Sequence, residues 1–474
     1  MKKKIVSLLL CFCLLPLSSK GQAVDRSSDA AFMRRLYLVM TGQLPDADVA
    51  RRFIDSRRPD KRDELIDLVL HHESYHRQML LHWGDILRIK SEFPSNLWPN
   101  GVQAYNRWIY KHLSDNTPYD VFVQQLLLSK GSNFKEPAVN FYRAFLDRSP
   151  EKVSANVHLL FMGEQQADAN VSVCFSQLRF KSTKEWKEEI VYPDVWSSSK
   201  VQPLSLPDQE QTLLQPASDW RISYVNWLTS DQNRQFAEVF VNRLWFWIMG
   251  EGLVTHPDPA VWPQRQATAR WKQLDAYVDL FVMSQYNVRE LTRNMLQSDA
   301  FQQALTTDFG FQSRRLPAET IVDAIATITL EHDVYQSRVP EPFTFYPKAT
   351  LSRDLGDATV SSPTLELFGR ASRDVSLESQ RKNQLTDRQV LYLMNSNDLE
   401  GRIRRSKSIA QVIAKAPDAA QLIEDAFLHV LLRYPTPAER RLFQAYARRS
   451  QSNLSSFAYD LYWTLMNSHE FLYY

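Results

Sequence analysis

Cysteine and glycine are scarce in this chain of 474 residues. Two of its three cysteines, Cys11 and Cys13, lie in an apolar stretch at the N-terminus, so only Cys174 remains once that stretch is removed. An internal disulfide framework is therefore excluded, and the fold must rely on its hydrophobic core. With 12 glycines and 12% aromatic residues, the composition favours helices packed through large side chains over glycine-rich phosphate loops.

The N-terminus has the layout of a secretory signal peptide. Three lysines precede an apolar core from Ile5 to Leu17, and small residues follow at Gly21 and Ala23. We expect cleavage after Ala23 and an exported protein, either periplasmic or secreted. The apolar core is shorter than the roughly 20 residues that a spanning helix needs, and no later segment reaches that length. The sequence therefore predicts no membrane span.

The charge balance argues against a nucleic-acid partner. Residues 1–23 contain four of the 56 basic residues, so 52 remain against 54 acidic residues, a net charge of −2. A nucleic-acid-binding protein of this size would carry a basic excess or a basic stripe. We expect neither.

Helical periodicity recurs along most of the chain, which predicts a mostly α, multi-helical protein with little or no β-sheet. Phe32, Leu36 and Val39 share one face of a segment that Gly42 stops. Further helices are predicted to begin after Asn287 and Pro317 and to cover about 419–432, 437–449 and 453–468.

Two stretches interrupt the helical pattern. The polar, Pro- and Ser-rich stretch 181–217 is interpreted as a linker between an N-terminal helical domain, 24–180, and a C-terminal helical domain, 218–474. The second stretch, about 333–363, is rich in proline and aromatics. We expect it to be an ordered, extended crossing segment that lines a groove and buries Phe343, Phe345 and Tyr346.

Five blocks together resemble a known family. They are FMRRLYLVMTGQLPDADVARRFI at 32–54, YNRWIYKHLSDNTPYDVFVQQLL at 105–127, NRLWFWIMGEGLV at 242–254, RRLPAETIVDAIA at 314–326 and LFGRASRDVSLESQRKNQLTDRQVLYLMN at 367–395. They are similar to the paired planctomycete-type domains of unknown function that often accompany cytochrome c modules in exported proteins. The resemblance implies a PSCyt-type N-terminal domain and a PSD-type C-terminal domain. It implies no established activity.

The chain departs from that family at its cysteines. Relatives commonly carry a Cys-x-x-Cys-His element that can anchor haem or ligate a metal, where this chain has Cys174 alone. In the fifth block, a Cys-Glu-Cys-Glu-Arg run is replaced by the run from Leu377 to Arg381. The chain is thus interpreted as a divergent member, and we expect no cofactor and no thiol-based metal or redox site.

The segment HESYH at 72–76 matches the His-Glu-x-x-His pattern of zinc hydrolases. Zinc needs both histidines on one continuous helix face, together with a third ligand. We interpret His72 and His76 instead as surface histidines at a turn between two helices, and we expect no metal.

Asn242 and Arg243 lie on an aromatic helix, where adjacent residues point about 100° apart, so at least one must find a polar partner near the apolar side. They either form structural hydrogen bonds or ion pairs between helices or belong to a ligand pocket. The expected partners of Arg243 are carbonyl groups or the carboxylates of Glu319, Asp323, Glu366 and Asp374.

A second polar cluster follows Gly369. Arg370, Arg373 and Arg381 either clamp an anion with bidentate hydrogen bonds or form a salt-bridge lattice. Arg314, Arg315, Glu319 and Asp323 offer a supporting polar network, the last three at four-residue spacing. Asp374 and Glu378 are the carboxylates suited to acid or base catalysis.

Three functions are compatible with these clusters. The first is an exported binding protein that takes an acidic or sulfated oligosaccharide in a cleft bounded by Arg243, Arg370, Arg373 and Arg381, as an accessory to polysaccharide use. The second is a carboxylate-dependent hydrolase or other glycan-processing enzyme that uses Asp374 or Glu378. The third is a structural or interaction partner of an exported redox complex, with no haem of its own.

Overall fold

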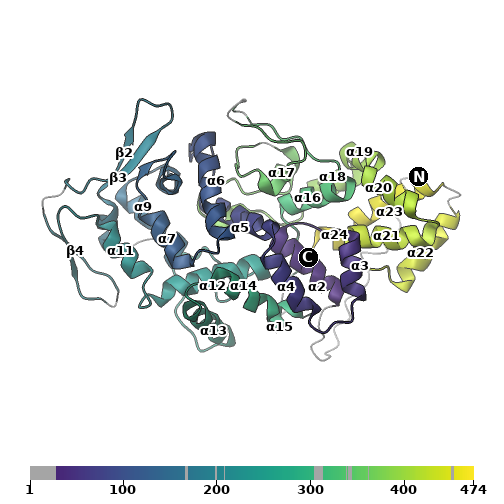
Figure 1. The fold of residues 1–474 in the computed structure, drawn as a ribbon, viewed down its shortest axis with the longest axis horizontal. Coiled ribbons are helices and arrows are strands. Elements are labelled where there is room, and N and C mark those ends of the chain that lie inside the picture. Colours follow the sequence, from purple (N-terminus) through teal and green to yellow (C-terminus); the bar gives the residue numbers. More distant parts are fainter. Residues whose placement is uncertain are drawn as a thin grey trace.

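The computed structural model describes residues 28–165, 169–197, 200–207, 209–303, 313–337, 339, 344–360, 362–449 and 453–474. The predicted signal peptide lies outside these residues. The predicted fold class is confirmed, since the described chain is mostly α-helical with small sheets (Figure 1).

The N-terminal half is built around α2, whose apolar face is buried as predicted and which ends at Gly42 with a left-handed φ of 62°. Its helices are α2 (Asp29–Thr41), α3 (Ala47–Asp55), α4 (Lys61–Leu70), α5 (Glu73–Ile86), α6 (Trp98–Ser114), α7 (Tyr119–Leu127), α8 (Asn140–Arg143), α9 (Pro150–Met162) and α10 (Ala169–Ser172).

Two small antiparallel sheets accompany these helices. One has the order β1-β3-β2, formed by β1 (Gly131–Ser132), β2 (Leu178–Ser182) and β3 (Glu189–Pro193), and the other pairs β4 (Gln202–Leu204) with β5 (Thr212–Leu214). In the β2–β3 hairpin, Phe180 lies opposite the fully buried Val191. The polar stretch 181–217 therefore contains strands, although the domain boundary placed there stays a prediction.

The C-terminal half returns to helices. They are α11 (Arg221–Leu228), α12 (Arg234–Met249), α13 (Ala269–Met283), α14 (Val288–Gln297), α15 (Asp299–Gln302), α16 (Ala318–Thr329), α17 (Pro363–Leu367), α18 (Asp387–Asn395), α19 (Asn397–Arg405), α20 (Lys407–Lys415), α21 (Ala419–Leu431), α22 (Pro437–Arg449), α23 (Leu454–Met466) and α24 (His469–Leu472). The helix starts predicted at Asn287 and Pro317 are confirmed, and the Asn287 side chain accepts a hydrogen bond from the backbone of Glu290.

The two halves interlock. In Figure 1, α2 lies between the teal helices α12 and α14 and the yellow C-terminal helices. Arg34 of α2 donates hydrogen bonds to the carbonyl oxygens of Val430, Glu470 and Phe471, which lie 396 to 437 positions further along the chain. The last residue of the chain is anchored as well, because Tyr474 donates its backbone N–H to the carbonyl oxygen of Arg314.

Of the crossing segment, the structure describes residues 333–337, 339, 344–360, 362 and 363. The segment departs from the expectation at Phe345, whose side chain is 69% exposed, whereas Tyr346 is partly buried. Phe343 lies outside the described residues. In the described part of the chain, no helix is both long enough and apolar enough to cross a membrane.

Candidate functional site

Charged side chains from both halves meet in a buried network. Arg381 donates to Oδ2 of Asp85 on α5 at 2.6 Å and also pairs with Glu319 on α16. Arg373 donates to the other oxygen of Asp85 at 2.9 Å, and Nε of Arg370 lies 3.8 Å from Glu319. We call these five residues the Asp85 network.

The network leaves little of its hydrogen-bonding capacity free. Arg370 also donates to the carbonyl oxygens of Asp357 and Val360, and Arg373 to that of Gly356. Burial acts to raise the pKa of the Asp85 carboxyl, but the guanidiniums of Arg381 and Arg373 outweigh it and hold that pKa below its ordinary value. The same balance between burial and Arg381 leaves the pKa of Glu319 below its ordinary value. Both carboxylates are therefore ionised, and the contacts are those of a salt-bridge lattice.

The predicted supporting residues have separate roles. Arg314 donates to the carbonyl oxygens of Phe246 and Trp247 in the last turn of α12, where helix-terminal carbonyl groups need hydrogen-bond donors from outside the helix. Arg315 precedes α16 and donates to the carbonyl oxygens of Phe368 and Lys382, so it does not share a helix face with Glu319.

Asp323, one turn after Glu319 on α16, anchors the crossing segment. Its carboxyl accepts hydrogen bonds from the backbone N–H and the hydroxyl of Ser352, both at 2.7 Å, and from the backbone N–H of Arg353 at 3.3 Å. Burial nevertheless raises the pKa of Asp323 to about 7.

Asn242 and Arg243 are buried on α12 and face different partners. The amide of Asn242 bonds the backbone of Val254 and Thr255, closing the loop after α12. Arg243 donates to the carbonyl oxygen of Leu160 at 2.5 Å, where α9 ends. Of the two kinds of partner expected for Arg243, the structure shows a carbonyl group. None of the four expected carboxylates pairs with Arg243 in the described part of the chain.

The carboxylates near Arg243 are instead Glu378 and Asp258. Nε1 of Trp247 donates to Glu378 at 2.7 Å, and Asp258 accepts from the backbone N–H of Ser379 at 3.1 Å. Burial raises the pKa of Glu378 to about 8, although the positive charge of Arg243 opposes the shift. Glu378 is thus a neutral acid at neutral pH.

A small cavity of about 60 Å³ lies beside Glu378, and His82, Trp247, Arg314 and Arg381 also line it. The ring of His82 stacks on Trp247 with centroids 4.9 Å apart, and burial lowers the pKa of His82 to about 3. The cavity is large enough for water or a small ion and too small for a sugar ring.

Asp374 lies apart from this cavity. Its side chain is 45% exposed and forms an ion pair with Lys90 at 2.6 Å, which lowers its pKa against the opposing effect of burial. The two carboxylates chosen from the sequence as catalytic candidates thus occupy different environments.

Helix α5 begins at Glu73, inside the HESYH segment, so the turn expected over this segment is wrong from Glu73 onward, and the surface position expected for His76 is wrong as well. His72 caps the helix by accepting the backbone N–H of Ser74, and His76 is buried, with its pKa lowered to about 4 mainly by burial. Within the described residues, no group of three or more His, Cys, Asp or Glu side chains is placed to hold a metal ion.

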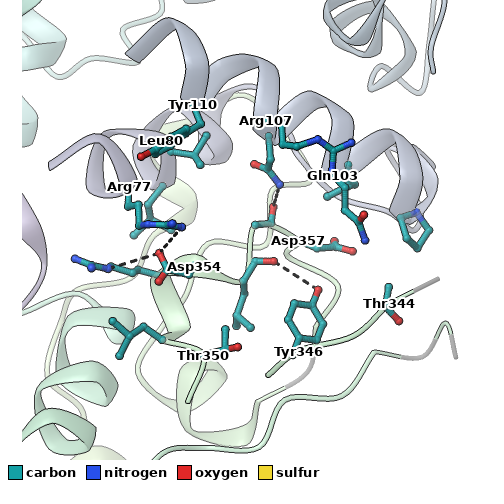
Figure 2. A pocket seen from close by; sticks show the side chains of 18 of the residues that line it. Arg77, Leu80, Gln103, Arg107, Tyr110, Thr344, Tyr346, Thr350, Asp354 and Asp357 are labelled. Carbon is teal, nitrogen blue, oxygen red and sulfur yellow. Dashed lines mark hydrogen bonds and ion pairs between the residues drawn. The ribbon is translucent and has the colours of Figure 1, made fainter. Parts of the chain in front are cut away.

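An open groove of about 880 Å³ lies between α5, α6 and the crossing segment (Figure 2). The face of α6 supplies Gln103, Arg107 and Tyr110, whose spacing of four and three residues places them side by side. The opposite wall is formed by 344–357, and Arg373 of the Asp85 network lies at its base. A groove along the crossing segment was expected from the sequence, but the wall that α6 contributes to it was not.

The groove walls are held in place from several sides. Nδ2 of Asn106 and Nη1 of Arg373 both donate to the carbonyl oxygen of Gly356, at 3.0 and 2.8 Å. Asp357 accepts the backbone N–H of Ser91 at 3.1 Å. The Asp85 network therefore contributes to the groove indirectly, because it fixes the segment that forms one wall.

Two arginines of the groove differ in their pairing. Arg77 pairs with Glu73 and lies 3.5 Å from Asp354, and its guanidinium lies 5.5 Å from the centre of the Tyr110 ring. Arg107 is exposed and makes no ion pair within the part of the chain that the structure describes. Arg107 was not predicted from the sequence. Its position on the same helix face as Gln103 and Tyr110 is the feature that could have indicated it.

These features define a mostly helical protein whose halves are joined by a buried charged network beside an open polar groove. Family models match both halves: PSCyt2, a protein of unknown function (DUF1549), matches residues 17–177, and PSD1, a protein of unknown function (DUF1553), matches residues 220–447. The chain belongs to this family of paired PSCyt2 and PSD1 domains. No curated protein and no solved structure matches it.

Proposed function

We propose that the protein is exported and binds an acidic or sulfated oligosaccharide in the groove between α5, α6 and the crossing segment, without turning it over. In this proposal the ligand lies in the groove next to the arginine cluster and not within the cluster, because Arg370 and Arg381 already donate to protein partners. One observation carries the proposal. Arg107 lines an open groove of about 880 Å³, and its exposed guanidinium has no carboxylate partner in the described chain.

The composition of the groove suits a sugar chain. Sugar rings present C–H faces that pack on aromatic rings, and Tyr110, Phe345 and Tyr346 offer such surfaces. Sugar hydroxyls need donors and acceptors, which Gln103 and Thr350 supply. A sulfate or carboxylate on the sugar would accept the paired N–H groups of Arg107.

A thermal-shift screen of residues 24–474 tests this function. Ligands that bind only the folded state raise the melting temperature. We expect sulfated or uronic oligosaccharides to stabilise the protein and neutral oligosaccharides of equal length to do so less. If no saccharide shifts the melting temperature, the proposed function is wrong and an exported protein partner takes its place.

A glycan-processing enzyme is the second candidate, and Glu378 is the observation that favours it. A carboxyl group with a pKa of about 8 can donate a proton at neutral pH, as a general acid must. However, the adjoining cavity of about 60 Å³ cannot admit a sugar ring. New reducing ends released from an oligosaccharide by the wild-type protein, and lost in Glu378→Gln, would establish this activity in place of simple binding.

A further inference from the structure

An aromatic and cationic platform lies at the N-terminal end of the groove's α6 wall. Trp186, in the turn between β2 and β3, is 58% exposed, and its ring centroid lies 4.6 Å from that of Trp98, the first residue of α6. Nζ of Lys187 lies 5.1 Å from the Trp98 ring and 5.9 Å from the Trp186 ring. We call Trp98, Trp186 and Lys187 the tryptophan platform.

The turn that carries the platform is fixed by hydrogen bonds. Glu188 accepts from the hydroxyl groups of Ser132 at 2.5 Å and Thr183 at 2.7 Å. Asn133 donates to the carbonyl oxygen of Lys187 at 3.3 Å, and Lys187 has a left-handed φ of 62°. A tryptophan held exposed on a braced turn is preorganised for contact with a ligand.

The platform is continuous with the groove. Pro99 and Val102, in the first turns of α6, line the groove immediately after Trp98. At a rise of 1.5 Å per residue, Trp98 and Tyr110 are about 18 Å apart along the helix axis. In Figure 1 the β2–β3 hairpin lies beside α6.

We propose that the tryptophan platform is a second binding subsite of the groove, so that the ligand is an anionic polysaccharide chain several sugar units long. One sugar ring packs on the tryptophans, and its sulfate or carboxylate pairs with Nζ of Lys187, while other units of the same chain occupy the groove near Arg107. This inference rests on the proposed function and specifies the length and polymeric nature of its ligand.

A series of sulfated oligosaccharides of increasing length, from disaccharide to octasaccharide, tests the subsite by calorimetry. For the wild-type protein we expect the affinity to rise with length until the chain reaches the platform. In Trp186→Ala the affinity for short chains should be unchanged, while that for the longest chains falls roughly 5- to 10-fold. Lys187→Ala should show the same dependence on length.

Trp196→Ala is the matched control, because Trp196 is 81% exposed and belongs to neither the groove nor the platform. It should behave as the wild type at every length. The inference is overturned if Trp186→Ala matches the wild type for all lengths, or if it weakens short and long chains equally. If no oligosaccharide of any length binds the wild type, the proposed function itself fails, which is a distinguishable result.

Discussion

Arg381 and Asp85 form an ion pair with a 2.6 Å contact across 296 positions of sequence, between the C-terminal half and helix α5 of the N-terminal half. The pair is almost completely enclosed, because the side chains are 10% and 5% exposed. A charge buried in this way is stable only while its partner remains, so the two halves depend on each other's charges.

Loss of Arg381 should therefore destabilise the whole protein. Arg381→Ala leaves Asp85 and Glu319 with fewer positive partners, and breaking a buried pair costs about 3–5 kcal/mol. Urea unfolding measures this change. Arg405→Ala is the control, since Arg405 is 63% exposed and pairs with Glu331 at the surface, and its effect should be too small to resolve. Unchanged stability in Arg381→Ala, accompanied by lost anion binding, would instead identify a ligand site.

Stability should decline with rising pH because of Glu378. Between its ordinary pKa of 4.5 and its folded pKa of about 8, the folded state retains a proton that the unfolded chain has released. The free energy of unfolding then falls as pH rises across this interval, by at most about 1.4 kcal/mol per pH unit for one group. Glu378→Gln cannot ionise and should flatten this decline in thermal melts from pH 5 to 9. Parallel curves for the two proteins would contradict the assignment.

The position of the crossing segment should depend on Asp323. Asp323→Ala leaves the backbone N–H groups of Ser352 and Arg353 without their acceptor, at a cost of about 1–3 kcal/mol for each buried group left unpaired, whereas the Ser352 hydroxyl keeps the carbonyl oxygen of Glu319 as an acceptor. Ser352→Ala removes only the hydroxyl and should cost less. Chemical unfolding measures both, and hydrogen exchange at 350–357 should accelerate in Asp323→Ala. Equal effects in the two variants would show that the backbone contacts contribute nothing.

The thiol of Cys174 should be inert until the protein unfolds. Its side chain is fully buried, and burial raises its pKa to about 12, which leaves almost no thiolate at neutral pH. A thiol-specific disulfide reagent should react with residues 24–474 only when denaturant is added. Rapid labelling of the native protein would place Cys174 in an accessible environment.

Local features were readable from the sequence because neighbouring residues determine them. The end of α2 at Gly42 and the start of α14 at Asn287 follow from backbone conformation and capping within a few residues. The β2–β3 hairpin was missed, since its five-residue strands alternate too briefly and lie in a polar stretch.

Contacts between segments far apart in the chain could not be predicted from the sequence. The arginines at 370, 373 and 381 stood out as a cluster, but periodicity within the cluster could not identify Asp85 as the partner of Arg373 and Arg381, or Glu319 as that of Arg370. The same limit applies to Arg243, whose acceptor is a helix-terminal carbonyl group of α9. The exposure of Phe345 also contradicts a rule based on hydrophobicity alone, because this residue borders an open groove.

The most direct test of the account is the calorimetric affinity of residues 24–474 for a sulfated oligosaccharide, compared among the wild type, Arg107→Ala and Arg388→Ala. Arg388 is an exposed arginine on α18 that does not line the groove. A hydrogen-bonded charge pair contributes about 1.5–3 kcal/mol, so Arg107→Ala should weaken binding roughly 10-fold or more while Arg388→Ala does not. Equal affinities in all three proteins would contradict binding of the anion in this groove.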